Sequence, residues 1–464
     1  MNDLTIPLQS ESKEPLYQQI YNYIKTEVQE GRLPAGQKLP STRALSAHLH
    51  VSRSTVDLSY EQLLSEGYIE SIPYKGHFVC EIAPLYRQEH RSVTKVQKPK
   101  IEAFLYDFSP NRIDMSVFPF ATWKRISKNV FLDEEREIFA TGDAQGDWRL
   151  RETICKYLHA SRGVLCEPDQ IIVGAGSDYL LLLLQKILKD VDVIAVENPT
   201  YMRAAHIFAS GNASVCPIPL DESGMRMDLL RQSGAKIAYI TPTHQFPTGL
   251  IMPVGRRNEM LGWANEAKER FIIEDDYDSE FRFRGRPIPS LQASDHNDKV
   301  IYLGTFSKTI APTIRVGYMV LPKPLLEIFH REYWFLSSTV SRIDQSILYH
   351  FMEEGHFERY LNKMRKNYRE KHDVMMEALK PFKKDFVIKG ATSGLHVILE
   401  DQLGRDEEEL VSLAKAVSCK VYPMQAYVLE ELPGKAQILL GFAALSKEQI
   451  KEGIMSLQKA WGVE

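Results

Sequence analysis

The sequence predicts a multidomain chain: an N-terminal winged helix-turn-helix module, an α/β domain with a mostly parallel, doubly wound sheet, and a small α+β domain. Three observations predict this fold class. Helical periodicity over residues 15–66 leads into a short hairpin, apolar strands alternate with helices between residues 171 and 303, and a long polar helix through residues 359–378 precedes further strand candidates. We expect domains at residues 1–82, 104–335 and 336–464, with a linker at 83–103.

The composition is that of an ordinary globular protein. Of the 464 residues 44% are hydrophobic, which is enough for a large core, and the net charge of -4 gives no overall indication of a polyanionic partner. The five cysteines form no C-x-x-C pair, and no apolar run is long enough to span a bilayer. We therefore expect a cytoplasmic protein with no membrane partner.

The first 82 residues carry the pattern of a DNA-binding module. Ser41 opens a short second helix and Ser52 caps a third helix that ends near Glu66, followed by a hairpin. Residues 1–80 hold seven basic and nine acidic residues, so binding of double-stranded DNA has to come from a local face. The candidate DNA contacts are Arg43, Ser52, Arg53, Ser54, Thr55 and Lys75.

A basic segment with little apolar periodicity follows, between Ala83 and Glu102. We expect a solvated tether, and contact of its basic residues with phosphates is the alternative. Twenty residues can extend to about 65 Å.

A candidate reactive lysine follows the predicted strand Val300–Leu303. A loop lysine is usually a solvated cation, but Lys308 has the hydroxyls of Thr305 and Ser307 before it and Arg315 after it. Hydroxyls and a guanidinium suit a phosphate, and a lysine beside a phosphate site indicates a Schiff base with pyridoxal 5'-phosphate.

The pyridine nitrogen of that cofactor needs a carboxylate. The strand Phe271–Ile273 runs into Glu274–Tyr277, and we expect Asp275 on the ring nitrogen and Tyr277 on the ring hydroxyl oxygen. A solvated turn is one alternative, and a cation site is another. The cation site would use Asp275, Asp276, Asp278 and Glu280. Neither alternative accounts for the lysine.

A second anion site is predicted where the strand Ile171–Val173 meets a long apolar helix. Gly176 and Ser177 stand at this turn, where backbone N–H groups at a helix N-terminus bind anions. Tyr179 occupies the place of the third glycine of a dinucleotide fingerprint, so a single phosphate is the better interpretation.

Four motifs resemble, in order, those of the fold-type-I aminotransferases, which are PLP-dependent: Asn198–Tyr201, Thr241–Gly249, Glu274–Tyr277 and Ser307–Lys308. Leu39–Arg43 and Ser52–Val56 resemble GntR modules, so the whole chain is similar to the MocR-type regulators of the GntR family, which include the GabR regulators. This resemblance implies that Tyr201 stacks on the cofactor ring and that the chain forms a head-to-tail homodimer. Arg203, two residues after Tyr201, is the candidate to meet a ligand carboxylate, and a surface arginine on a helix is the alternative.

Two departures from the aminotransferase pattern bear on activity. Phe246 replaces the asparagine that usually holds the ring hydroxyl oxygen, and no arginine follows Arg405, so the small-domain clamp for an α-carboxylate is missing near Leu439. Gln425 to Tyr427 also replace the arginine of the GabR pattern. A site without the clamp orients an α-amino acid poorly for proton transfer.

These observations predict a transcription regulator, rather than an enzyme, that senses an amine, amino acid or short peptide through an external aldimine at Lys308. An active aminotransferase with a scaffolding N-terminal module is the alternative. A regulator with an empty pocket is disfavoured because Lys308, Asp275, Tyr277 and Arg315 are all present.

Overall fold

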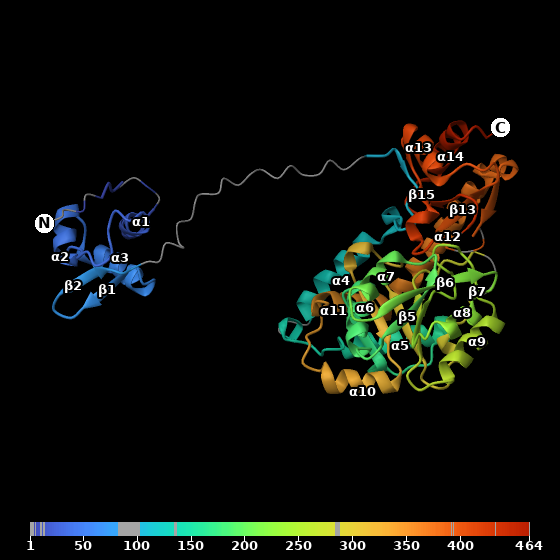
Figure 1. Ribbon diagram of the computed structural model, residues 1–464, viewed down its shortest axis with the longest axis horizontal. Helices are drawn as coiled ribbons and strands as arrows, with labels where there is room; N and C mark the ends of the chain where they lie inside the picture. Colours follow the sequence, from blue (N-terminus) through green and yellow to red (C-terminus); the bar gives the residue numbers. More distant parts are fainter. Residues whose placement is uncertain are drawn as a thin grey trace. The chain divides into compact units, whose positions relative to one another are not determined.

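The computed structural model describes residues 14–81, 103–133, 137–283, 288–390, 394–431 and 433–463, together with residues 4, 6–9, 12 and 392. The chain divides into two compact units, Met1–Ile101 and Glu102–Glu464 (Figure 1). The linker expected at 83–103 lies, except for its last residue, outside the described residues. No helix in the described ranges is both long and apolar enough to cross a membrane.

The first unit is the predicted winged helix-turn-helix. It contains α1 (Leu16–Gln29), α2 (Thr42–Leu49), α3 (Arg53–Ser65) and the antiparallel hairpin of β1 (Ile69–Ile72) and β2 (Gly76–Val79). The Ser41 and Ser52 side chains accept hydrogen bonds from the backbone N–H groups of Ala44 and Thr55, so both serines cap their helices as expected. A separate apolar core that includes Ile20, Val56 and Leu63 holds the module together.

The second unit is built on an eight-stranded sheet with the order β4-β11-β10-β9-β8-β5-β6-β7. Pairing is parallel from β6 through β5, β8 and β9 to β10, and antiparallel where β11 and β7 join, so the mostly parallel sheet is confirmed. The strands are β4 (Ile171–Gly174), β5 (Val193–Asn198), β6 (Ser214–Asp221), β7 (Gly224–Met225), β8 (Ile237–Ile240), β9 (Phe271–Asp276), β10 (Val300–Thr305) and β11 (Gly317–Val320).

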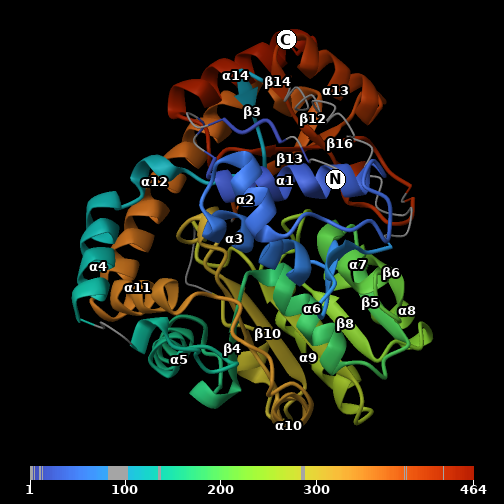
Figure 2. The ribbon, with the colours of Figure 1, turned by 90° about the vertical axis from the view of Figure 1, so that its left-hand side faces the viewer.

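Helices cover both faces of this sheet, which makes it doubly wound (Figure 2). Along β5, Ile194 and Val196 pack with Leu184 and Phe208 on one face, whereas Ala195 packs with Trp263 on the other, as the two-residue period of a strand requires. The helices of this domain are α4 (Phe120–Asp133), α5 (Trp148–Arg162), α6 (Ser177–Ile187), α7 (Met202–Ala209), α8 (Met227–Gln232), α9 (Val254–Asn265) and α10 (Lys323–Glu332).

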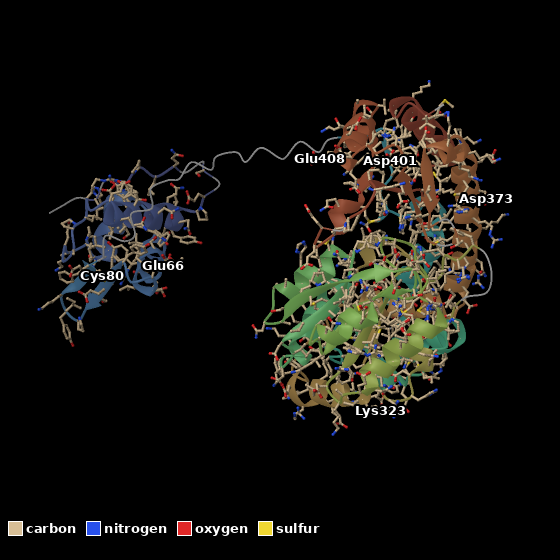
Figure 3. The ribbon with its side chains drawn as sticks, turned by 45° about the vertical axis from the view of Figure 1, so that its right-hand side comes forward. Glu66, Cys80, Lys323, Asp373, Asp401 and Glu408 are labelled. Carbon is tan, nitrogen blue, oxygen red and sulfur yellow. The ribbon has the colours of Figure 1, made fainter. Side chains whose placement is uncertain are left out.

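A small α+β domain follows, as the sequence predicts. Its antiparallel sheet has the order β12-β13-β16-β15, and β3 from the start of the second unit pairs in parallel with β14. Figure 3 shows Glu408 of this domain and Lys323 of α10 at opposite ends of the unit. The elements are α11 (Arg342–Glu353), α12 (His356–Ala378), β12 (Phe386–Lys389), β13 (His396–Asp401), α13 (Glu407–Ala416), β14 (Cys419–Lys420), β15 (Tyr422–Pro423), β16 (Gln437–Gly441), α14 (Lys447–Ala460) and β3 (Tyr106–Asp107).

Two leucines of α6 provide a matched test of this packing. Leu184 is fully buried in the core on one sheet face, whereas Leu182 is 45% exposed. We expect Leu184→Ala to lower the free energy of unfolding by about 2–5 kcal/mol, since it leaves a cavity. Leu182→Ala should change it by about 0.5 kcal/mol at most. All five tryptophans lie in Glu102–Glu464, so denaturant unfolding followed by their fluorescence reports on this unit alone, and equal effects of both variants would contradict the assigned core.

Candidate functional site

Lys308 lies just past the carboxyl end of β10, at the edge of the sheet where α/β folds place their sites. The side chain is partly buried, and its Nζ donates a hydrogen bond to the backbone oxygen of Pro110 at 3.0 Å. Burial lowers the pKa of Lys308 to about 8. About a tenth of this amine is therefore unprotonated, and nucleophilic, at pH 7, far more than for an exposed lysine.

Asp275 and Asp276 end β9 and turn to opposite sides. Asp275 accepts a hydrogen bond from the Tyr239 hydroxyl at 2.5 Å, and burial raises the pKa of its carboxyl to about 6. Asp276 pairs with the buried Arg162, with 2.7 Å between Nε and Oδ2, and accepts from the Tyr302 hydroxyl at 2.6 Å. Asp276 is thus bound to structural partners, while Asp275 has one neutral donor and remains available to a ligand.

Tyr277 belongs to a hydrogen-bonded group of side chains that the sequence did not indicate. Its hydroxyl lies 2.9 Å from His244 Nδ1, and the same nitrogen lies 3.0 Å from Asp278 Oδ2. His244 sits in the Thr241–Gly249 motif, but sequence reasoning gave it no role. The imidazole and its carboxylate partner hold the orientation of the Tyr277 hydroxyl.

The four acidic side chains of the alternative cation site have different partners. Asp275 binds Tyr239, Asp276 binds Arg162, Asp278 binds His244, and Glu280 Oε1 accepts from Tyr157 at 2.9 Å. Because the four carboxylates face four different partners, they are not arranged as one set of cation ligands.

The predicted anion site is assembled at the N-terminus of α6. Gly176 caps this helix with a φ of 83°, and a Cβ added there would lie 3.0 Å from Arg315 Nη2, so glycine admits the guanidinium. The Thr305 Oγ1 accepts from the Ser307 N–H at 3.1 Å, and the Ser307 Oγ is buried without a hydrogen-bond partner among the described residues. An unpaired buried hydroxyl beside an arginine and a helix N-terminus fits a phosphate group.

Two arginines share one carboxylate at this site. Arg315 Nη2 lies 2.9 Å from Asp178 Oδ2, and Arg203 Nη1 lies 3.1 Å from the same oxygen. Sequence reasoning did not assign a role to Asp178. The structure brings Arg203 to the anion site, with 58% of its side chain exposed.

An apolar cluster occupies the region expected for the carboxylate clamp. Phe246 packs with Ile398, Met424, Tyr427 and Leu439, and these side chains are all buried. Tyr201 is the residue that caps the N-terminus of α7. Its ring meets the Phe246 ring nearly at right angles, with 6.0 Å between the ring centroids. This wall supplies apolar surface where the aminotransferase pattern supplies a cation.

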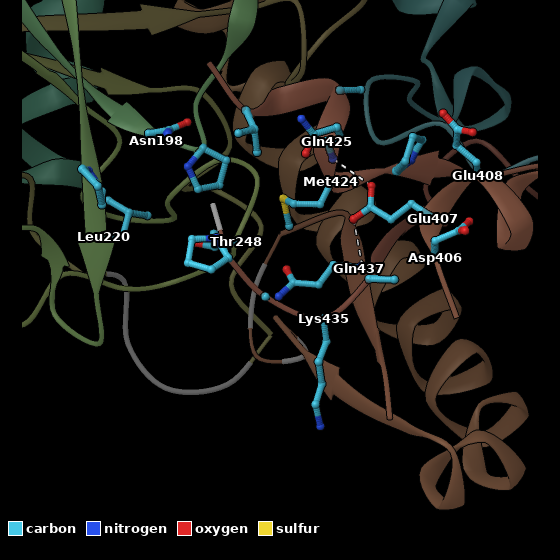
Figure 4. A pocket seen from close by; sticks show the side chains of 18 of the residues that line it. Asn198, Leu220, Thr248, Asp406, Glu407, Glu408, Met424, Gln425, Lys435 and Gln437 are labelled. Atoms are coloured by element: carbon cyan, nitrogen blue, oxygen red, sulfur yellow. Dashed lines mark hydrogen bonds between the residues drawn. The ribbon is translucent and has the colours of Figure 1, made fainter. Parts of the chain in front are cut away.

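A large cleft borders this cluster between the two domains of the second unit. Its volume is about 1260 Å³, and its walls include Asn198 and Leu220 on one side and Met424 and Gln437 on the other (Figure 4). Glu407 accepts from the backbone N–H groups of Gln425 and Gln437, each at 2.9 Å, and so fixes the small-domain wall. Met424 belongs both to this cleft and to the Phe246 cluster, whereas Lys308, Asp275 and Tyr277 do not line the cleft.

The candidate DNA contacts lie at the start of α3, in the first turn of α2 and on the hairpin. Arg43, Ser52, Arg53, Ser54 and Lys75 are exposed and Thr55 is partly buried. The Ser52 and Thr55 hydroxyls lie 2.7 Å apart, and Arg53 reaches Asp57 at 3.6 Å with 69% of its side chain exposed. The helix therefore presents a guanidinium and hydroxyls at its first turn, where recognition helices contact DNA.

The fold and site define a protein that joins a helix-turn-helix module to an aminotransferase-like domain. Residues 16–79 match the gntR family of bacterial regulatory proteins, and residues 110–457 match the aminotransferases of class I and II. The chain therefore belongs to the family of HTH-type transcriptional regulators that combine a gntR-type module with an aminotransferase class I and II domain.

Relatives support both parts of this assignment. The chain is 40% identical to the HTH-type transcriptional regulator YhdI of Bacillus subtilis, over 99% of this chain and 98% of that protein. It is 31% identical to the probable rhizopine catabolism regulatory protein MocR of Rhizobium meliloti, over 96% and 94%. A multiple substrate aminotransferase from Thermococcus profundus matches 78% of this chain and 92% of its own, with 28% identity and a TM-score of 0.69.

The two adjacent aspartates should respond oppositely to removal of their charge. In cofactor-free protein near neutral pH, Asp276→Asn should cost about 3–5 kcal/mol of stability, because it leaves Arg162 buried and unpaired. The pKa of Asp275 is raised, so its contribution to stability is present below about pH 4 and is lost as pH rises through about 6. Relative to wild type, Asp275→Asn should therefore gain about 2 kcal/mol between pH 4 and 7.5.

Denaturant unfolding at several pH values measures both effects. Glu266→Gln, which removes the partly exposed pair with Arg270, serves as the surface control and should cost under about 1 kcal/mol. A large loss for Asp275→Asn near neutral pH would show that Asp275, too, is bound to a structural cation.

Proposed function

We propose that this chain is a DNA-binding transcription regulator that holds pyridoxal 5'-phosphate at Lys308 and senses a primary amine, an amino acid or a short peptide. One observation carries the proposal. A gntR-type module and a full set of polar groups around Lys308 occur in one chain, while apolar side chains occupy the place of the carboxylate clamp.

The described residues fit the cofactor at each of its polar groups. Asp275 would pair with the ring nitrogen, and Tyr277, oriented by His244, would meet the ring hydroxyl oxygen. Tyr201 would pack against the ring. The phosphate would take the helix N-terminus at Gly176 and Ser177, the hydroxyls of Thr305 and Ser307, and Arg315.

When bound, the cofactor supplies an aldehyde carbon at which the amino group of Lys308 can be exchanged for that of an effector. On exchange, the amino group of Lys308 would take up the proton given up by the incoming amine, and it could again donate its hydrogen bond to the Pro110 oxygen. Burial lowers the pKa of Lys308 to about 8, so its amine would be a weaker base and a better leaving group than that of an exposed lysine. Arg203, beside the phosphate end, is the anchor proposed for an effector carboxylate.

The Pro110 contact offers a route from the site to the start of the second unit. Pro110 lies between Phe108, whose oxygen accepts from the Gly441 N–H at 2.8 Å, and Asp114, which pairs with Lys371 at 2.6 Å. The state of Lys308 therefore acts on the segment that joins the small domain to the chain leading from the DNA module. Two arrangements of this segment, favoured by different states of Lys308, would couple effector to DNA binding.

The proposed regulator acts in the cytoplasm as a head-to-tail homodimer. Support comes from the resemblance to MocR-type regulators and from the cysteine pattern. An active aminotransferase remains the second candidate, favoured by the nearly complete set of cofactor partners.

Replacing the lysine tests the sensor. We expect Lys308→Ala to lose pyridoxal 5'-phosphate on dialysis and to bind DNA with the same affinity with or without amines. Wild type should change its DNA affinity by about 5- to 150-fold when its effector is added. The measurement is visible absorption and fluorescence anisotropy with a DNA fragment obtained by selection from random sequence, during titration with amines, D- and L-amino acids and dipeptides.

Lys323→Ala, on the surface of α10, is the matched control and should behave as wild type. A ligand-specific absorption shift that persists for hours supports the sensor. Conversion to the pyridoxamine form, reversed by a keto acid, would instead establish the aminotransferase.

The DNA-binding face makes a separate prediction. Arg53→Ala should weaken binding to the selected DNA by about 1–3 kcal/mol if the guanidinium contacts a base, or lower the salt dependence by about one counterion if it contacts a phosphate. Arg32→Ala is the control. Arg32 is an exposed arginine of the same module that follows α1, outside the proposed recognition helix, and it pairs with Glu27 of α1. Anisotropy at several salt concentrations measures both quantities, and equal losses for the two variants would argue against α3 as the recognition helix.

A further inference from the structure

Three side chains that could bind a metal ion meet at the end of α5, away from Lys308. Cys155 and His159 lie four residues apart on this helix, and Cys166 lies on the segment that follows it. Both cysteines are buried and His159 is exposed. Residues four apart share one face of a helix, so the spacing directs Cys155 and His159 to the same point.

The distances among the three ligand atoms match those of tetrahedral zinc. The two Sγ atoms are 3.8 Å apart, and His159 Nε2 lies 3.6 Å from Cys155 Sγ and 4.0 Å from Cys166 Sγ. Zn–S bonds of about 2.3 Å and Zn–N bonds of about 2.0–2.1 Å at tetrahedral angles place two sulfurs about 3.8 Å apart and sulfur and nitrogen about 3.6 Å apart. The distance between the two sulfurs and the distance from His159 Nε2 to Cys155 Sγ agree closely with these values, and the distance from His159 Nε2 to Cys166 Sγ is slightly long.

Hydrogen bonding accounts for only part of this arrangement. Cys155 Sγ donates to the Cys166 backbone oxygen at 3.2 Å, and His159 Nε2 lies 2.8 Å from the same oxygen. The Cys166 side chain, in contrast, has only the Cys155 sulfur and the His159 ring nitrogen as its polar contacts in the described part of the chain. A metal ion would give all three side chains a common partner.

The cluster is open to solvent on one side. His159 and Cys166 border a surface cavity of about 380 Å³, which also has Glu167, Asp295 and His296 on its walls. An ion can enter through this cavity, and a water molecule can complete the fourth vertex. Two thiolates and an imidazole favour Zn²⁺ over Mg²⁺ or Ca²⁺, which prefer oxygen ligands.

We propose that Cys155, His159 and Cys166 form a zinc site. Two metal–sulfur bonds and one metal–nitrogen bond form, and the two thiol protons are released to solvent. Burial raises the pKa of both thiols, so both are protonated before the ion binds. The ion would fasten the end of α5 to the segment leading into β4, and Arg162 on this helix holds Asp276 beside Asp275.

Cobalt substitution of the full-length, reduced protein provides the test. We expect one Co²⁺ per chain, with the visible ligand-field bands of tetrahedral coordination and thiolate charge-transfer bands, displaced by Zn²⁺. Zn²⁺ should also raise the melting temperature of wild type. Cys166→Ser and His159→Gln should each weaken Zn²⁺ binding by at least about 10-fold.

Cys216→Ser is the matched control, since Cys216 lies on β6 and outside the cluster, and it should bind Co²⁺ as wild type does. His159→Gln changes an exposed side chain, and an unchanged denaturant unfolding curve of the metal-free variant shows that loss of binding there is not a folding defect. Absence of a tetrahedral spectrum in wild type, or binding that survives both Cys166→Ser and His159→Gln, would overturn the proposal. Formation of a Cys155–Cys166 disulfide in place of metal binding under the same conditions would also overturn it.

Discussion

The ion pair between Arg162 and Asp276 is the constraint on which the site depends. Both side chains are nearly fully buried, and an unpaired charge in such a place is costly, so the pair fixes the end of β9 relative to α5. Successive side chains of a strand point to opposite faces, and with Asp276 held on one face Asp275 must project from the other. There it meets Tyr239, on the neighbouring strand β8. The same end of the sheet carries Lys308 after β10, so the position of the reactive lysine relative to Asp275 follows from parallel strand pairing.

The sequence predicts those parts of the structure that local patterns determine. Apolar runs predict β9 and β10, and serines predict the starts of α2 and α3. Lys308 is singled out because it lies just after the end of a predicted strand. Contacts between residues that are distant in the sequence could not be predicted in this way. No periodicity relates Arg162 to Asp276, His244 to Tyr277, or β3 to β14, because each pairing depends on how the chain crosses over. The family resemblance identifies the Thr241–Gly249 motif, yet only the fold brings His244 Nδ1 within hydrogen-bond distance of both the Tyr277 hydroxyl and the Asp278 carboxylate.

Under the proposed function, the apolar cluster around Phe246 is the physical feature that separates a sensor from a catalyst. A transaminase must hold its substrate so that a proton leaves a defined carbon, and a bidentate arginine provides that orientation. Apolar side chains such as Met424 and Tyr427 can contact an apolar substituent but exert no directional force on it. In the proposed sensor, an amine against such a wall would exchange with Lys308 without being positioned for the next proton transfer. Stable occupancy serves regulation, whereas turnover would consume the effector.

The charge state of the site is consistent with the same proposal. Burial lowers the pKa of His396 to about 4, so this ring, 5.6 Å from His244, remains neutral and adds no cation near Lys308. Lys308 itself is driven toward its neutral form by burial, and Asp278, which opposes that shift, is already engaged by His244. A lysine that is easily neutral is both a ready nucleophile and a ready leaving group. Under the proposed function, exchange between Lys308 and a competing amine would be decided by the contacts each amine makes, and the contact that Lys308 would gain on leaving is the Pro110 oxygen. Discrimination among effectors and the signal to the rest of the chain would then arise from one exchange equilibrium.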